Sequence, residues 1–147
     1  MFHSGLTKPE RELRTLLRFW LVAFFLVGLV FATFPDDVSA FLNTVGQYLR
    51  WPGPELPPMQ GHLWHVLAIS LMGILVVICS RAIKELGHSL LLVRLLMMAK
   101  SISGVGYIIA LGGTTCFAYL AGAVIDLGIA GLTYFCYRQV VALKGSQ

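Results

Sequence analysis

Four long apolar stretches, almost without charge, constrain the fold of this chain more than any other feature. They run over about residues 16–34, 63–80, 90–111 and 116–137, and a helix needs about 20 apolar residues to cross a hydrocarbon core of about 30 Å. Only 12% of the 147 residues are charged, about half of the roughly 25% in an average soluble domain. The sequence therefore predicts an all-α integral membrane protein, a single transmembrane domain over 1–147 built as a bundle of four transmembrane helices.

The N-terminal segment carries a helix-start signal. Thr7 and Glu10, three residues apart, resemble a capping box, and Pro9 suits a first helical turn. A secretory signal peptide is the alternative, because basic residues precede the apolar run and residues 38–40 (Val-Ser-Ala) offer a small-residue cleavage site. The apolar run is longer than the usual signal core of about 7 to 15 residues, which favours an uncleaved membrane anchor.

The longest connection, residues 35–62, is predicted to begin with a short amphipathic helix on the external membrane surface, capped by Asp36 or Asp37. Its apolar positions recur at helical spacing, and polar residues occupy the other side. The apolar positions are Val38, Phe41, Leu42, Val45 and Leu49, and the polar ones are Ser39, Asn43, Thr44 and Gln47. We expect Tyr48 and Trp51 to anchor this helix at the interface. The proline-rich residues 52–58 should be irregular.

Basic residues are distributed unequally between the connections. Nine Lys and Arg lie before the first span, in 81–94 and after the fourth span, against Arg50 alone on the other side. The positive-inside rule then places both termini and a basic turn of Arg81 and Lys84 with Gly87 and His88 in the cytoplasm. The loop 35–62 and a tight reversal at residues 112–115 (Gly-Gly-Thr-Thr) become external.

Two charged residues remain within the predicted spans, Lys100 in the third and Asp126 in the fourth. If the chain reverses between Gly113 and Thr114, both lie within about 2 Å of the same depth, at 1.5 Å rise per residue. An isolated charge at mid-bilayer costs at least about 2.5 to 3.5 kcal/mol. We therefore expect the two side chains to pair.

The helical faces that carry these charges are rich in small or polar residues. Lys100 shares its face with Ser103, Gly104 and Tyr107, and Asp126 shares its face with Tyr119, Gly122, Ala123, Ala130 and Thr133. Small residues let membrane helices approach closely, so we predict that the two faces pack together. The positions predicted to meet lipid on the fourth span are Leu120, Val124, Leu127 and Phe135.

Intramembrane ionisable residues are candidates for a proton relay or a ligand site. The ligand or relay candidates are Lys100, Asp126, Ser103, Tyr107 and Tyr119. A structural ion pair that fixes helix register is the favoured interpretation, because no further ionisable residues mark a pathway across the bilayer.

Other potential site residues carry weaker signals. His62 and His65, with Trp64 between them, are weak candidates near the start of the second span, and interfacial hydrogen bonding explains them as well as ligation does. Nothing predicts a metal, since no other span contains a histidine. The cysteines are Cys79, Cys116 and Cys136, three single residues without zinc or redox spacing, for which we expect no disulfide. No catalytic triad, phosphate loop or basic nucleic-acid stripe occurs.

The layout of one span, an external amphipathic segment, a second span and a final hairpin resembles the DoxX-like family of small bacterial four-helix membrane proteins. The matching residues are Lys100, Ser101, Tyr107, Asp126 and Arg138. The resemblance implies a location in the bacterial inner membrane and a quinone-linked partnership. It carries over no catalytic residues.

Three functions remain open from the sequence. The favoured one is a non-catalytic subunit, anchor or assembly partner of a larger membrane complex, without a cofactor, in contact with lipid and with other membrane proteins or further copies of itself. One alternative is a small-solute or proton-coupled transporter that uses Lys100 and Asp126. The other is a redox subunit that binds quinone near Trp64 and His65. The sequence favours a protein that is not an enzyme.

Overall fold

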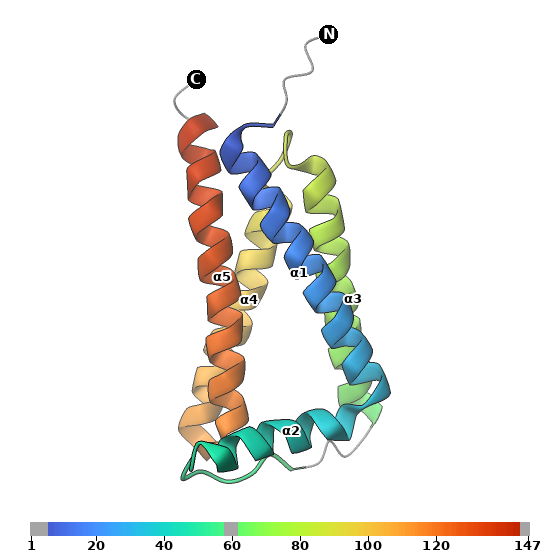
Figure 1. The fold of residues 1–147 in the computed structure, drawn as a ribbon, viewed down its shortest axis with the longest axis vertical. Helices are drawn as coiled ribbons and strands as arrows, with labels where there is room; N and C mark the ends of the chain where they lie inside the picture. The colour runs from blue at the N-terminus through green and yellow to red at the C-terminus, as the bar shows by residue number, and fades with distance from the viewer. Residues whose placement is uncertain (1–5, 58–61, 145–147) are drawn as a thin grey trace.

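The computed structural model describes residues 6–57 and 62–144, without the side chains of residues 62–65 and 144. Figure 1 shows five helices: α1 (Lys8–Thr33), α2 (Pro35–Tyr48), α3 (His62–Glu85), α4 (Leu91–Thr114) and α5 (Phe117–Lys144). Four of them, α1, α3, α4 and α5, are long and apolar enough to cross a membrane. The chain is therefore a multi-pass membrane protein, as predicted, and α2 is the short helix expected between the first two spans.

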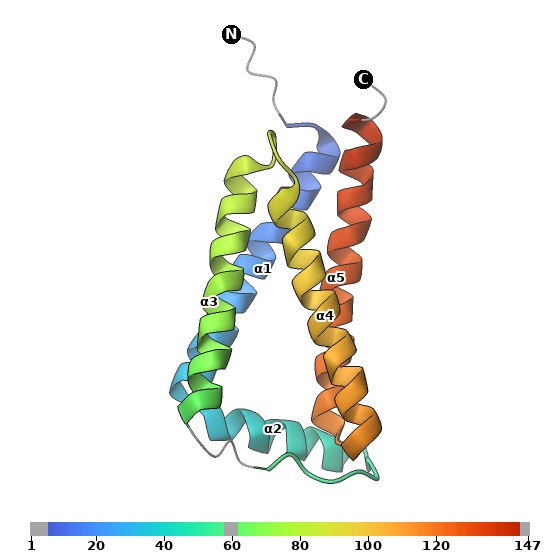
Figure 2. The same ribbon diagram turned by 180° about the vertical axis from the view of Figure 1, so that it is seen from behind.

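The four spanning helices are arranged as two pairs. The most extensive packing joins α1 to α3 and α4 to α5. Figures 1 and 2 show that the two pairs lie close together where α1 begins and α5 ends, and diverge toward the opposite end. There α2 lies across the bundle, from the end of α1 to the start of α5. We call the first end the basic end and the second the α2 end.

Most of the core lies in the half of the bundle toward the basic end, where the helix pairs meet. Its fully buried side chains come from all four spans and include Leu13, Leu17, Cys79, Leu86, Val93, Leu96 and Val140. On α1, the buried residues Leu13, Leu17, Trp20 and Phe24 repeat every three or four positions, so one stripe of this helix faces the core. Large apolar side chains between them, such as Phe19, point outward, as expected of residues that face lipid.

The predicted start of α1 is confirmed. The backbone N–H of Thr7 donates to Oε2 of Glu10 at 2.9 Å, and the Thr7 hydroxyl donates to the same oxygen at 3.0 Å. Pro9 lies in the first turn, where a backbone N–H has no acceptor within the helix. The missing N–H of proline therefore costs no helical hydrogen bond.

The start and the buried face of α2 differ from the prediction. Its N-cap is Phe34, and Asp36 lies within the first turn, because the helix already begins at Pro35. Ser39, expected on the polar outer side, is buried instead. It is buried together with Gly46, where an added Cβ would lie 3.2 Å from Cβ of Phe117 on α5. Since α2 packs across other helices, small residues occupy its buried face.

Trp51 contacts the hairpin of α4 and α5. Its indole N–H donates to the carbonyl oxygen of Thr115 at 2.6 Å, and its ring makes an edge contact with Phe117. The irregular segment that follows is held by Asn43, whose side chain accepts from the Leu56 N–H and donates to the Leu56 carbonyl. The two contacts of Trp51 attach the end of α2 to the hairpin of α4 and α5.

Each of the two turns occupies the later part of its predicted range, and Gly87 and His88 follow the end of α3 at Glu85 as predicted. Lys84 belongs to the last turn of α3, where a cation stabilises the helix dipole. Gly112 and Gly113 are helical, and the chain reverses at Thr115, which adopts the left-handed conformation at φ 50°. The Thr115 N–H donates to the Leu111 carbonyl at 2.8 Å, which closes the end of α4.

Candidate functional site

The predicted charge pair forms. Nζ of Lys100 on α4 lies 2.7 Å from Oδ1 of Asp126 on α5, a distance typical of a charge-assisted hydrogen bond. Only 5% of Lys100 and 6% of Asp126 are exposed. The pair is therefore enclosed by protein rather than by lipid.

A third residue completes the environment of the ammonium group. The ring of Phe24 on α1, itself buried, lies with its centroid 5.0 Å from Nζ of Lys100. The negative face of an aromatic ring attracts a cation at this distance, and more strongly when water is excluded. Phe24 was not predicted as a site residue, because nothing in the sequence distinguishes it from the other aromatic residues of the first span.

Close packing of α4 on α5 continues next to the pair. Gly104 is buried, and a Cβ placed on it would lie 2.6 Å from Cγ of Leu127. Leu127 therefore covers Gly104, and with 37% of its surface exposed it also faces outward, as predicted. Of the other predicted lipid-facing residues, Val124 and Phe135 are exposed, at 64% and 66%, and Leu120 is half-buried.

Two predicted candidates meet one turn further toward the α2 end. The rings of Tyr107 and Tyr119 have centroids 6.3 Å apart. Gly122 makes room for Tyr107, since a Cβ on Gly122 would lie 2.9 Å from the tyrosine ring. The remaining candidate on this face, Ser103, is half-buried. The small and polar faces of α4 and α5 thus pack together, as predicted.

Thr133 belongs to a different contact from the one predicted. Its hydroxyl accepts a hydrogen bond from the indole N–H of Trp20 on α1 at 3.2 Å and donates to the Ile129 carbonyl at 2.7 Å. It therefore joins α5 to α1, on the side of α5 next to the face that meets α4. Helical periodicity places Thr133 near the Asp126 face but does not show which helix it meets.

The side chains of the weak candidates His62, Trp64 and His65 lie outside the described part of the structure. The three cysteines are unpaired, with Cys79 and Cys116 buried. Within the described part of the chain, no three His, Cys, Asp or Glu residues lie close enough to hold a metal ion.

The arrangement is a closed polar contact rather than an open cavity. Lys100 and Asp126 neutralise each other, Phe24 covers the ammonium, and the neighbouring glycines bring the helices together. Comparison with protein-family models, with curated proteins and with solved structures finds no match to this chain.

Proposed function

We propose that this protein is a non-catalytic subunit, anchor or assembly partner of a larger membrane complex. The observation that carries the proposal is a stripe of small residues and isoleucines on the outer side of α4. It consists of Ala99, Ile102, Gly106, Ile109 and Gly113, all of which are exposed. We call it the α4 outer stripe.

The α4 outer stripe has the composition of a helix–helix interface without a helix packed on it. Its residues are three or four positions apart, so they share one side of α4, away from Lys100. No heavy atom lies within 4 Å of a Cβ placed on Gly106 or Gly113. In membranes, small residues let a second backbone approach closely, and packing of this kind drives helix association. A transmembrane helix of a partner protein fits this surface.

The close packing around the ion pair supports the same proposal. A transporter that used Lys100 and Asp126 would need further polar groups between this pair and the two membrane surfaces. The neighbouring turns instead bring Leu127 onto Gly104 and Tyr107 onto Gly122. The pair thus acts as a structural contact that fixes α4 against α5.

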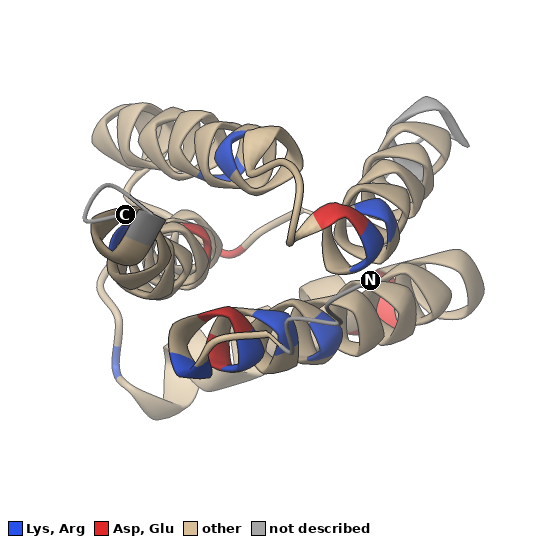
Figure 3. Ribbon diagram, turned by 90° about the horizontal axis from the view of Figure 1, so that it is seen from above, with Lys and Arg blue, Asp and Glu red and all other residues tan. Residues whose placement is uncertain are grey.

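The proposal includes an orientation in the bacterial inner membrane, with both termini in the cytoplasm. Figure 3, a view onto the basic end, shows Lys and Arg residues on several helices near the chain termini. Basic residues at the ends of spans are retained on the cytoplasmic side. Membership of the DoxX-like family, with its link to quinone-dependent complexes, is part of the same proposal.

The test is purification of the tagged full-length chain from its native membranes in a mild detergent, with mass spectrometry of the proteins and small molecules retained. We expect a partner protein in stoichiometric amount with wild type and its loss with Gly106→Leu. The matched control is Gly112→Leu, on the same helix but off the stripe and with equally open surroundings.

Retention of the partner by Gly106→Leu would contradict the role of the stripe. A chain that purifies alone with bound quinone would overturn the subunit proposal and favour the redox alternative. If only further copies of this chain are recovered, the complex is a homo-oligomer and not an assembly with a different protein.

A further inference from the structure

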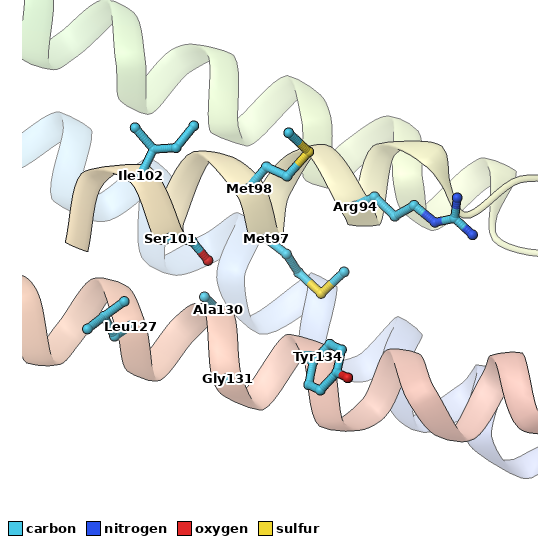
Figure 4. Close-up of a pocket in the computed structure, with 9 residues that line it drawn as sticks. All are labelled: Arg94, Met97, Met98, Ser101, Ile102, Leu127, Ala130, Gly131 and Tyr134. Atoms are coloured by element: carbon cyan, nitrogen blue, oxygen red, sulfur yellow. The ribbon is translucent and has the colours of Figure 1, made fainter. Parts of the chain in front are cut away.

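An open groove of about 610 Å³ lies between α4 and α5 on the outside of the bundle (Figure 4). Met97, Met98 and Ile102 of α4 and Leu127 of α5 give it an apolar lining. Gly131 of α5 keeps it wide, because no heavy atom lies within 4 Å of a Cβ placed there. Pockets of about 300 to 1,000 Å³ accommodate small organic ligands.

The length of the groove is close to the depth that a lipid acyl chain occupies in one leaflet. Arg94 lies at one end and Ile102 near the other, eight residues apart on α4. At 1.5 Å per residue this separation is about 12 Å along the helix. Half of a typical hydrocarbon core is about 15 Å. The groove is therefore nearly as long as one leaflet of the hydrocarbon core is thick.

The basic end of the groove carries a positioned cation. Nε of Arg94 donates to the hydroxyl of Tyr137 at 2.6 Å, and the guanidinium lies 5.6 Å from the centroid of the same ring. This bond leaves the terminal nitrogens of Arg94 as donors for another group. Among the described residues, no carboxylate forms an ion pair with Arg94.

A second, more polar cavity continues the groove beyond the start of α4. It has a volume of about 330 Å³ and shares Arg94 with the groove, and its other lining residues include His88 and Ser89. On the α5 side, the guanidinium of Arg138 lies 6.0 Å from the ring centroid of Tyr134, which also lines the groove. The cationic end is thus wide enough for a headgroup, and the apolar groove leads away from it into the bilayer.

We propose that this surface binds an anionic phospholipid of the leaflet at the basic end. An acyl chain lies along Met97, Ile102 and Leu127, and the phosphate accepts hydrogen bonds from Arg94. Guanidinium groups recognise phosphate by paired, charge-assisted hydrogen bonds, and a phospholipid carries phosphate and acyl chain at matching depths. The site is on a different side of α4 from most of the α4 outer stripe, and the proposal does not depend on the subunit role.

The experiment measures lipid binding to the delipidated full-length protein in detergent by native mass spectrometry. The probes are phosphatidylglycerol and phosphatidylcholine with identical oleoyl chains. We expect wild type to bind phosphatidylglycerol more tightly, and Arg94→Gln to lose about fivefold in affinity for it, the effect of about 1 kcal/mol per interfacial basic residue. The charge control is Arg81→Gln, at the same end but outside the groove, which should keep the wild-type preference.

A second variant tests the groove without touching its charge. Gly131→Leu should weaken binding of both lipids, because the new side chain occupies the space of the acyl chain. Gly128→Leu, one turn away on α5, outside the groove and equally open, is its control. Thermal melting of each variant tests whether it is folded. If Arg94→Gln is not folded, the comparison of Gly131→Leu with Gly128→Leu tests the proposal.

Three outcomes would overturn the proposal. One is equal affinity of wild type for the two lipids. Another is an equal loss with Arg81→Gln and Arg94→Gln, which would indicate diffuse surface charge. The third is full competition by inorganic phosphate, which would make the site one for a free anion.

Discussion

The ammonium of Lys100 and the carboxylate of Asp126 form a direct ion pair at 2.7 Å that joins consecutive helices inside the bundle. Each partner is more than nine-tenths buried. In such surroundings, removing one partner leaves a buried charge unpaired and costs much free energy, whereas removing both charges does not. This difference makes the structural role of the pair measurable.

We predict that Lys100→Met and Asp126→Asn each lower the free energy of unfolding in detergent. The expected loss is about 3 kcal/mol or more, as for other buried pairs that lose one partner. The double variant Lys100→Met with Asp126→Leu should recover most of the loss, because it leaves no charge unpaired. Stable single variants that abolish the flux of a proton or solute in liposomes would instead establish the transporter alternative.

The contact between Gly104 and Leu127 gives a second prediction. Gly104→Ala should lower the free energy of unfolding by about 1 to 3 kcal/mol, because the methyl group overlaps Leu127 and separates α4 from α5. Gly128→Ala has open surroundings and should stabilise the protein, by up to about 1 kcal/mol of helix propensity. Equal melting temperatures for the two variants would show that the helices do not approach as closely as described.

The attachment of α2 to the reversal between α4 and α5 depends on Gly53. A Cβ on Gly53 would overlap the Thr115 carbonyl oxygen and lie 2.8 Å from Nε1 of Trp51. Gly53→Ala should therefore break the bond between Trp51 and Thr115. We expect faster hydrogen exchange at the backbone amides of α2, with the α1–α3 pair unchanged. Gly73→Ala, placed in open surroundings on α3, is the control, and unchanged exchange in α2 would contradict the prediction.

The proposed orientation can be tested with two exposed residues at opposite ends. The Lys8 side chain is 82% exposed at the basic end, and Tyr48 is 87% exposed at the α2 end. In a chain whose three natural cysteines are replaced by alanine, a membrane-impermeant maleimide should label the Tyr48→Cys variant in intact cells. It should label the Lys8→Cys variant only after permeabilisation. The reverse pattern would place both termini outside.

The ion pair was predictable because it depends only on chain geometry. Two helices joined by a short reversal place residues at similar distances from the turn at similar depths, and buried opposite charges then pair. The start of α1 at Thr7 and Glu10 was predictable for a similar reason, since all its partners lie within one helical turn.

The remaining features depend on residues that are distant in the sequence. Thr115 adopts a left-handed conformation next to two helical glycines, and its carbonyl is held by Trp51, 64 positions earlier. Thr133 meets Trp20, 113 positions earlier, although its place on α5 suggested α4 as its neighbour. Periodicity identifies the faces of a helix, but only the assembled bundle determines which face meets which helix.

The ion pair lies entirely within the α4–α5 hairpin, and this has a consequence for biogenesis. During synthesis α4 leaves the ribosome before α5, so Lys100 reaches the membrane without its counter-ion. The carboxylate arrives 26 residues later. We therefore expect the two helices to move from the translocon into lipid together, as one neutralised unit. The hairpin then docks on α1, and Phe24 covers the charge.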